Sequence, residues 1–372
     1  MVAITGGRGF LGWHVRALGL ARGLAPFRRV PVGLALDGDS SRAAVDGCER
    51  LLHLAGVNRG SDDDVRDGNV LFARQLADAV TTAEAPPTTV VFADSVQAGN
   101  GTAYGEGKAR AADLLQAAAD RVGAEFVDLR LPNLFGEHGR PDHNSVVATF
   151  CDRLASGRRP HVEVDRPLDL LSAQKAAEFV LGERAPADLA SAGTRRRVSE
   201  VLAELVALDA EHHGASMPAL DGDWRRDLFN ALRSATFAHR PTIDLAGRTS
   251  GAGRTGGADE RGAFHEIVRT TGGAGQTSFS TTVPGVVRGQ HFHRRKVERF
   301  CVVGGDAVIR LRRVLTDDVL EIPVSGDHPV AVDIPTLWAH SLVAVGDRPV
   351  QTLFWVDEPF DPTTPDTFQE DV

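Results

Sequence analysis

The chain begins with a stretch that decides the fold of its first half: Val2-Ala3-Ile4-Thr5-Gly6-Gly7-Arg8-Gly9-Phe10-Leu11-Gly12. Its first four residues form a short apolar run that is typical of a buried strand. Gly6 would make the tight turn after this strand, Gly9 would let the backbone approach a pyrophosphate, and Gly12 would let the next helix pack close to the sheet. A helical pattern continues from Leu11 to Leu24. The stretch therefore predicts a dinucleotide-binding turn.

The next segments repeat the alternation of strand and helix. An apolar run at residues 50–54 leads into Ala55 and Gly56, a small-residue loop against which an adenosine would lie, and Asn69 opens the next helical pattern. A second run at 89–93 is rich in β-branched and aromatic residues and indicates another buried strand. Alternating strands and helices predict an α/β doubly wound parallel sheet, whose ligands bind at the carboxyl ends of the strands.

Tyr104 is the only tyrosine of the chain, and Lys108 follows four residues later. On a helix these two side chains share one face. An ammonium beside the phenol would lower its pKa from about 10 toward neutrality and make it a usable proton donor. Ser95 follows the strand at 89–93, so we expect the three side chains to meet over a nicotinamide. The alternative is a core tyrosine beside a solvated lysine, with Ser95 as a strand-end cap.

The second half contains a different pattern. Five residues have the spacing G-x5-H-x-H-x4-E-x6-G, namely Gly285, His291, His293, Glu298 and Gly305. His291 and His293 alternate along a strand and so face one side of the sheet, and His340, after Pro335, is the expected fourth ligand. Three imidazoles and one carboxylate suit a divalent ion such as Zn²⁺, with room for water. The alternative is a pair of exposed strand histidines and a surface glutamate.

Length and composition indicate two domains in this chain of 372 residues. Residues 246–257 are rich in glycine and lack apolar periodicity, so we expect a linker there between domains at 1–245 and 258–372. The formal net charge of −9 argues against a nucleic-acid-binding surface.

Three features bear on where the protein works. Cys48, Cys151 and Cys301 are isolated and lack C-x-x-C spacing, which favours buried thiols in a reducing compartment. The chain enters its first strand at once and leaves no room for a signal peptide. No apolar run approaches the roughly 20 residues of a membrane span. We therefore expect a cytoplasmic enzyme without a membrane or nucleic-acid partner.

Residues 1–240 resemble an extended short-chain dehydrogenase/reductase. The matching marks are Thr5-Gly6 to Gly12, His53-Leu54-Ala55-Gly56, Asn69, Ser95, Tyr104 to Lys108, and Arg130-Leu131-Pro132-Asn133-Leu134-Phe135-Gly136. The resemblance implies that Tyr104 is the catalytic acid, that Lys108 binds the nicotinamide ribose and Tyr104, and that Ser95 binds the reacting oxygen. The implied cofactor contacts are Gly6, Gly9, Phe10, Leu11, Gly12, Leu54, Ala55, Gly56, Asn69 and Lys108. The implied substrate contacts are Asn133 and Arg140.

Residues 258–372 resemble a cupin, a small double-stranded β barrel. Leu337 stands where the pattern usually has a turn glycine, and Val343 or Ala344 replaces the usual asparagine. Many sugar epimerases with this barrel use a histidine and a tyrosine, but this part of the chain contains no tyrosine. Lys296 occupies the position of a lysine in the resembled family and is a candidate proton carrier. A solvated strand lysine is the alternative.

The whole chain resembles the bifunctional capsular-polysaccharide enzymes that act on UDP-2-acetamido-2,6-dideoxy-hexos-4-uloses on the way to UDP-N-acetyl-L-fucosamine. The stretches that carry this resemblance are residues 54–59, 132–136, 144–151, 324–327, 332–335, 360–362 and 365–367. It implies epimerisation at C3 of a UDP-linked 4-keto-6-deoxy amino sugar in the cupin, then NADPH-dependent reduction at C4 to a UDP-2-acetamido-2,6-dideoxy-L-talose-type product. Reduction removes the ketone that made C3 labile, and so locks the configuration.

Several alternatives stay open from the sequence. Asp37, after a strand predicted at 32–36, favours NADH, whereas Arg42 and the resemblance favour NADPH. The main functional rival is a monofunctional 4-ketosugar reductase with a structural metal-binding cupin, and a non-enzymatic nicotinamide sensor is the other. The metal is either structural or a Lewis acid. The helix at 104–122 is the usual dimer face of the superfamily, so a homodimer is expected by analogy.

Overall fold

The computed structural model describes residues 1–24, 26–33, 38–245, 256–259 and 262–372. Contacts divide the chain into two compact units. The N-terminal unit comprises Met1–Leu134 and Leu168–Arg195, and the C-terminal unit comprises Phe135–Pro167 and Arg196–Val372. None of the described helices is long and apolar enough to cross a membrane.

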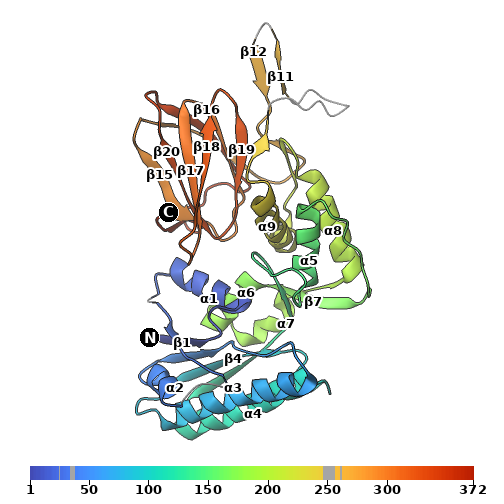
Figure 1. Ribbon diagram of the computed structural model, residues 1–372, viewed down its shortest axis with the longest axis vertical. Coiled ribbons are helices and arrows are strands. Elements are labelled where there is room, and N and C mark those ends of the chain that lie inside the picture. The colour runs from blue at the N-terminus through green and yellow to red at the C-terminus, as the bar shows by residue number, and fades with distance from the viewer. Residues whose placement is uncertain (25, 34–37, 246–255, 260–261) are drawn as a thin grey trace. The chain divides into compact units, whose positions relative to one another are not determined.

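The N-terminal unit is built on a parallel five-stranded sheet (Figure 1). In spatial order its strands are β2 (Arg28–Arg29), β1 (Val2–Thr5), β3 (Arg50–His53), β4 (Thr89–Ser95) and β5 (Glu125–Leu131). Its helices are α1 (Phe10–Ala21), α2 (Gly38–Val45), α3 (Asp62–Thr82), α4 (Ala103–Val122), α6 (Ala173–Leu181) and α7 (Leu189–Ala192), with a 3₁₀ turn η1 at Pro186–Asp188. A small sheet has the order β6 (Asn133–Phe135), β7 (Pro167–Ser172) and β8 (Thr194–Arg197).

The two faces of the parallel sheet are buried by different helices. On one face, Phe92 and Leu51 pack with Leu76 of α3 and Leu115 of α4, and these two helices lie side by side (Figure 1). On the other face, β-strand side chains pack with residues of α1 and α6. Because both faces are covered, the strand side chains are apolar in succession, as in other parallel sheets. This confirms the predicted doubly wound α/β fold.

One local prediction in this unit differs from the structure. The strand predicted at 32–36 is not where β2 lies, since β2 comprises Arg28–Arg29 and residues 34–36 fall outside the described part. The backbone N–H of Gly33 instead donates to the Gln75 side chain, whose amide donates back to the Gly33 carbonyl. Asp37 and residues 246–255 of the predicted linker also lie outside the described residues.

The C-terminal unit contains two antiparallel five-stranded sheets that share one core. The first has the order β10 (Ile243–Asp244), β19 (Val330–Ile334), β16 (Glu298–Gly304), β21 (Val350–Val356) and β14 (Gln276–Thr282). The second has the order β18 (Val319–Ser325), β17 (Asp306–Arg313), β20 (Trp338–Ala344), β15 (Val287–Phe292) and β22 (Phe368–Gln369). Buried side chains of both sheets form a single cluster, including Phe300, Leu311 and Leu342. This is the predicted cupin-type barrel.

Further elements of the C-terminal unit surround the barrel. The helices are α5 (Val146–Ala155), α8 (Val198–Glu211) and α9 (Gly222–His239). Two short pairs join β9 (Ser216–Met217) to β13 (Arg269–Thr270) and β11 (Gly256–Asp259) to β12 (Gly262–His265).

Residues 196–245 pack on the barrel, although the sequence ranges assign them to a domain at 1–245. Phe237 of α9 belongs to the barrel core. Arg233 donates from Nη1 to the Ile334 carbonyl at 2.6 Å, and Arg226 lies 3.2 Å from the Asp357 carboxylate. Helical periodicity shows that such a helix has an apolar face, but it does not show which partner covers that face. The compact units therefore differ from the sequence ranges.

Candidate catalytic and metal sites

The predicted dinucleotide turn has the geometry that its glycines require. Gly6 adopts a φ of 66°, and a Cβ on it would lie 2.6 Å from the Ala55 amide nitrogen. A Cβ on Gly12 would lie 2.2 Å from the Gly6 carbonyl oxygen. Gly9 is the N-cap of α1, and its amide donates to the Gly6 carbonyl at 2.8 Å. Phe10 and Leu11 begin α1, so the turn presents a helix N-terminus, which favours a phosphate.

The loop at 54–57 is held beside this turn by two side chains. The Thr5 hydroxyl accepts hydrogen bonds from the amides of Leu54 and Ala55, at 3.0 and 3.1 Å. Asn69, which lies inside α3 and not at its start, accepts from the Val57 amide and donates to the Val57 carbonyl. Asn69 therefore shapes the loop that contains Gly56. The sequence pattern placed Asn69 among the cofactor contacts. In the structure its side chain is hydrogen-bonded to the backbone of Val57.

The structure brings Ser95, Tyr104 and Lys108 together at the carboxyl end of β4. Ser95 and Lys108 are buried, and the Ser95 side chain is close enough to the Tyr104 phenol to oppose the rise of its pKa. The Lys108 ammonium donates to the Ala93 carbonyl at 2.6 Å and lies 4.1 Å from the centre of the Phe92 ring. Lys108 is thus not a solvated lysine.

The pKa of Tyr104 differs from the sequence prediction. Burial raises the pKa of Tyr104, the interaction with Ser95 opposes this, and the nearby Asp94 carboxylate adds to the rise. The expected lowering by Lys108 is wrong for this structure, because the ammonium is held at the Ala93 carbonyl and the Phe92 ring. Burial lowers the pKa of Lys108 to about 8, with Asp94 and Asp128 opposing the shift.

The two predicted substrate residues fall in different units. Asn133 belongs to the N-terminal unit, where its side-chain amide donates to the Asp169 carbonyl at 3.2 Å. Arg140 belongs to the C-terminal unit and is exposed. Both remain predictions as substrate contacts.

The four predicted metal ligands form one group. The candidate ligand atoms of His291, His293, Glu298 and His340 all lie within 4.8 Å of one another. His291 of β15 and His340 of β20 are paired in register, next to a β-bulge between Gly289 and His291 that redirects the strand. One carboxylate oxygen of Glu298 lies 3.1 Å from Nε2 of His293 and 3.2 Å from Nε2 of His340.

These residues fit a divalent cation. The Nε2 atom of His340 is fully buried and has no hydrogen bond of acceptable geometry among the described residues, although Glu298 is near. Nδ1 of His293 lies 2.6 Å from the Asp366 carbonyl, and Nδ1 of His340 lies 3.3 Å from the Trp338 carbonyl. Such contacts place the ring proton on Nδ1 and leave Nε2 free to bind a metal.

Electrostatics favour the ligand forms of His291 and Glu298, whereas Glu298 and Asp366, against the effect of burial, raise the pKa of His293, whose proton a bound cation would displace. Burial, together with His340 and His293, lowers the pKa of His291 to about 4. Burial alone would raise the pKa of Glu298, but hydrogen bonds and charges of His293 and His340 hold it well below its usual range. A neutral imidazole and an ionised carboxylate are the states that bind a metal. The alternative of exposed histidines and a surface glutamate is therefore wrong.

Lys296 is buried, which contradicts the alternative of a solvated lysine. Its ammonium donates to the Pro365 carbonyl and lies 5.7 Å from the centre of the Phe360 ring. The Asp366 carboxylate accepts hydrogen bonds from the backbone amide of Lys296 and from the two amides before it. The sequence pattern did not identify Asp366, whose carbonyl also orients His293.

Leu337 builds the turn for which a glycine was expected. It adopts the left-handed conformation with a φ of 63°, and its amide donates to the His293 carbonyl at 2.7 Å. Its side chain is only 1% exposed. Burial of the leucine side chain offsets the strain of this conformation.

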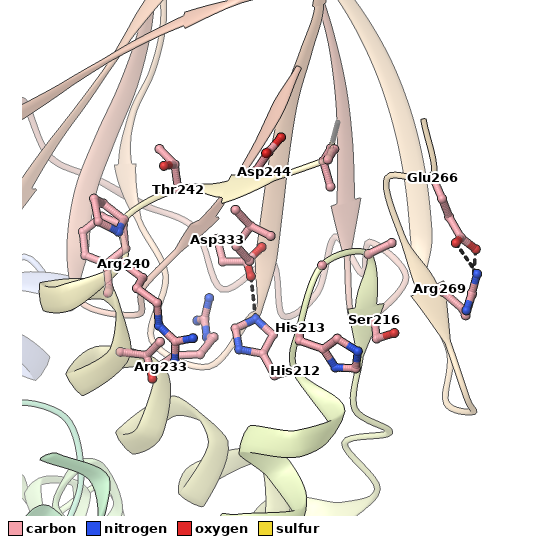
Figure 2. Close-up of a pocket in the computed structure, with 17 residues that line it drawn as sticks. His212, His213, Ser216, Arg233, Arg240, Thr242, Asp244, Glu266, Arg269 and Asp333 are labelled. Carbon is pink, nitrogen blue, oxygen red and sulfur yellow. Dashed lines mark hydrogen bonds and ion pairs between the residues drawn. The ribbon is translucent and has the colours of Figure 1, made fainter. Parts of the chain in front are cut away.

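A separate cavity of about 500 Å³ lies in the C-terminal unit, where the ends of α8 and α9 approach β10 (Figure 2). In its wall, His212 contacts Asp333 at 2.6 Å, and Asp333 is also paired with the fully buried Arg299. Among the described residues that line the cavity, none is a predicted catalytic residue or metal ligand. Its charged groups join α8 to the barrel.

Comparisons with known proteins agree with this architecture. Residues 2–175 match the NAD dependent epimerase/dehydratase family, and residues 257–368 match the polysaccharide biosynthesis C-terminal domain. The chain is 28% identical to UDP-2-acetamido-2,6-beta-L-arabino-hexul-4-ose reductase of Pseudomonas aeruginosa, over 99% of this chain and 97% of that protein. Spore coat polysaccharide biosynthesis protein SpsL of Bacillus subtilis is 26% identical over 29% of this chain and 78% of its own length.

Solved structures show the same similarity. The capsular polysaccharide assembling protein CapF from Staphylococcus aureus is 29% identical, with a TM-score of 0.58 and complete coverage of both chains. UDP-glucose 4-epimerase from Thermotoga maritima is 16% identical with a TM-score of 0.51, over 63% of this chain and 97% of its own, and shares the fold alone. The chain is therefore similar, along its whole length, to proteins that join a domain of the NAD dependent epimerase/dehydratase type to a polysaccharide biosynthesis C-terminal domain.

Proposed function

We propose that this protein is a bifunctional nucleotide-sugar enzyme that epimerises a UDP-linked 4-keto-6-deoxy amino sugar at C3 and then reduces its C4 ketone with NADPH. One observation carries the proposal. A chain that matches a UDP-4-ketosugar reductase along its length also combines a Ser95, Tyr104 and Lys108 group with a buried group of three histidines and one glutamate. A reductase alone does not need the second group. The sugar product would be of the UDP-2-acetamido-2,6-dideoxy-L-talose type.

In the reduction, bound NADPH would supply the hydride to C4. Tyr104 donates the proton to the developing C4 oxyanion, since its raised pKa keeps the phenol protonated near neutral pH. Ser95, which lies near the Tyr104 phenol, orients the C4 oxygen of the substrate. Lys108 holds the nicotinamide ribose. The turn from Gly6 to Gly12 and the loop from Leu54 to Gly56 bind the dinucleotide.

In the epimerisation, His291, His293, Glu298 and His340 would hold a divalent ion, for which we propose Zn²⁺. Such an ion polarises a keto oxygen and so acidifies the neighbouring C3 hydrogen. Lys296 is the candidate proton carrier, and it would have to leave the Pro365 carbonyl to act. We further propose Asn133 and Arg140 as substrate contacts and a homodimer formed through α4. The sequence domains that we propose, 1–245 and 258–372 with a linker at 246–257, have other boundaries than the compact units, because residues 196–245 belong to the C-terminal unit.

The main rival is a monofunctional reductase with a structural metal-binding cupin. Two observations favour it. The C-terminal unit has no tyrosine, and the ammonium of Lys296 is already bound to a backbone carbonyl. The rival predicts no exchange of the C3 hydrogen with solvent.

The test is solvent exchange in D₂O. The full-length Tyr104→Phe variant is incubated with the 4-keto sugar nucleotide and no nicotinamide, and deuterium at C3 is measured by NMR. The proposal expects deuterium at C3 without reduction, lost in Tyr104→Phe/His291→Ala and kept in Tyr104→Phe/His328→Gln, because His328 is an exposed histidine outside the metal group. If C3 deuterium appears in the Tyr104→Phe protein no faster than in Tyr104→Phe/His291→Ala, the protein is a monofunctional reductase. A fragment 1–245 is unsuitable as a control, because α9 contributes Phe237 to the barrel core and residues 196–245 belong to the C-terminal unit.

A further inference from the structure

The cavity beside α8, α9 and β10 has the size of a small-molecule site. Its volume is about 500 Å³, and such sites usually measure about 300–1,000 Å³. Most of its wall is apolar. The apolar lining residues are Gly214, Ala215, Phe237, Pro241, Ile243 and Leu245. A ligand with an apolar body therefore fits this space.

One face of α9 supplies polar groups to the same wall. Arg233 and Thr236 line the cavity from this helix, and Arg240 follows at its end. Residues three or four positions apart on a helix share one face. Figure 2 shows Arg233 and Arg240 on one side of the cavity, and Glu266 with Arg269 on the other. The α9 face is therefore the part of the wall that would hold a polar group of a ligand.

Arg233 is a buried cation without an anion. Its side chain is 2% exposed. Nη1 donates to the Ile334 carbonyl at 2.6 Å, and Nη2 donates to the Asn230 side chain at 3.4 Å. Nε is buried without a hydrogen-bond partner, and no carboxylate of the described residues lies within 4 Å of the guanidinium. Because buried charges in proteins are normally paired, this group can accommodate a negative charge from outside the chain.

Asp333 lines the same cavity but already has its own partners. Oδ1 accepts from Nε of Arg299 at 2.6 Å, and Oδ2 accepts from Nη2 of Arg299 at 2.8 Å. Oδ2 also lies 2.6 Å from Nε2 of His212. Since both oxygens are occupied, Asp333 does not pair with Arg233.

The other arginines of the wall each have a carboxylate nearby. Arg269 donates from Nε to Glu266 at 2.8 Å. Arg240 is exposed and lies 3.7 Å from the Asp209 carboxylate. Among the described residues that line the cavity, Arg233 is therefore the only arginine without a carboxylate within 4 Å.

Thr236 adds a second unpaired group next to Arg233. Its hydroxyl oxygen is buried and has no hydrogen-bond partner among the residues that the structure describes. A hydroxyl donates one hydrogen bond, and a carboxylate accepts through two oxygens. One carboxylate at this wall can therefore satisfy the Thr236 hydroxyl and Nε of Arg233 together, through charge-assisted hydrogen bonds.

We propose that this cavity binds a small organic molecule that carries a single carboxylate on an apolar body. The carboxylate pairs with Arg233 and Thr236, and the body packs against Phe237 and Leu245. One unpaired cation matches one negative charge, which favours a carboxylate over a phosphate group of about −1.5 to −2. The inference does not rest on the proposed function, because none of the described lining residues belongs to the catalytic or metal group.

The first experiment uses the full-length protein with its metal, 4-phenylbutyrate as the probe and 4-phenylbutan-1-ol as its uncharged counterpart. Isothermal calorimetry should show saturable binding of the carboxylate at about one site per chain. The alcohol should bind at least about tenfold more weakly, because it lacks the charge that pairs with Arg233. Absence of saturable binding, equal affinity for the alcohol, or displacement of the probe by inorganic phosphate would overturn the proposal.

The second experiment locates the site with a matched pair of variants. Thr236→Val removes the unpaired hydroxyl and keeps the shape of the side chain. Thr352→Val does the same in β21 (Val350–Val356), where the hydroxyl is also buried without a partner but does not line the cavity. Both substitutions remove an unsatisfied polar group, so both proteins should fold.

Thr236→Val should weaken binding of 4-phenylbutyrate by about tenfold, the usual effect of losing a hydrogen bond to a charged group. Thr352→Val should leave the affinity unchanged. Equal affinities in the two variants would overturn the proposal, because a probe bound elsewhere, such as at the metal group, is insensitive to Thr236.

Arg233→Gln tests the charge directly. Its amide can still donate to the Ile334 carbonyl, but binding of 4-phenylbutyrate should fall to the level of the alcohol. A folded Arg233→Gln protein with parental affinity would contradict the proposal. If this variant does not fold, the two threonine variants still decide the question.

Discussion

The two candidate sites hold their charges in opposite ways. In the metal group, Glu298 touches two histidines at 3.1 and 3.2 Å. Near the candidate catalytic tyrosine, Asp94 raises the pKa of Lys108 and of Tyr104 although it makes no ion pair with Lys108. Contact keeps Glu298 in the ionised state that binds a cation and raises the pKa of His293. The distant Asp94 carboxylate raises the pKa of both Tyr104 and Lys108. Burial strengthens both effects because it removes the screening by water.

Because the two sites differ in this way, we expect mutations to impair them to different extents. A group of four ligands fails when one of them is lost, because the remaining donors no longer complete the site. A proton donor is a single group, and its loss leaves the binding of cofactor and substrate intact. A charge acting from a distance changes only a midpoint. We therefore expect the largest effect at the metal group and the next largest at the proton donor.

The largest effect is expected at the metal group. His291→Ala or His340→Ala should reduce metal content from about one divalent ion per chain to near zero, as measured by elemental analysis after dialysis. His328→Gln is the matched control and should keep its metal. Full occupancy in both ligand variants would rule out this set of ligands.

Tyr104→Phe should lower the rate of ketone reduction by about 10²–10⁴-fold, the usual contribution of a general acid. Binding of NADPH, followed by its fluorescence, should be retained, since the phenol is not among the dinucleotide contacts. A variant that reduces the ketone at the parent rate would contradict the assignment of Tyr104.

Asp333→Asn should destabilise the C-terminal unit by about 3–5 kcal/mol, because it leaves Arg299 buried without its partner. Glu321→Gln removes a surface partner of Arg310 and should cost at most about 1 kcal/mol. Urea denaturation at pH 7 measures both. Equal costs for the two variants would show that the Asp333 pair contributes no more than a surface pair.

The Asp333 carboxylate should also make the stability of the C-terminal unit depend on pH. Although burial would raise it, Arg299 and His212 hold the pKa of Asp333 well below its usual range. Its contribution to stability is therefore complete above the unfolded-state pKa of about 3.9 and is lost as the pH falls below that value. The difference in stability between the parent and Asp333→Asn should shrink between about pH 5 and pH 2. A constant difference across this range would contradict the assignment.

The smallest effect concerns the turn at Leu337. Leu337→Ala and Leu337→Gly both lose a buried side chain, but only glycine tolerates a φ of 63° without strain. Leu337→Gly should therefore be more stable than Leu337→Ala by about 1 kcal/mol, the reverse of the usual order. Thermal unfolding of the two variants decides this, and an alanine variant of greater stability would show that the turn is not strained.

Much of the fold and of both candidate sites follows from local patterns. The glycine turn, the alternation of strands and helices, and the histidine spacing all depend on neighbours within a few residues. Backbone geometry converts such spacing directly into shared faces. For this reason His291 and His293 were correctly expected to lie close together, with their ring centres 5.0 Å apart, although β15 ends at Phe292 and His293 follows it.

Other features depended on packing between distant segments. Nothing in the sequence of α9 shows that Phe237 belongs to the barrel core, or that Asp366 orients His293. The pKa of Tyr104 was predicted with the wrong sign, because helical spacing brings Lys108 near but does not show that Ala93 and Phe92 hold its ammonium. Electrostatic effects depend on burial and on every nearby charge, including Asp94.

The sequence by itself determined which residue types are available at each site and in what local order they stand. Strand and helix periods are properties of the backbone, so they can be recognised before folding is known. The tertiary structure alone decided which of these groups lose water, which charges face one another, and which proton each group keeps. Those outcomes depend on distances between segments far apart in the chain, such as β4, β5 and α4 at Asp94, which local spacing does not encode.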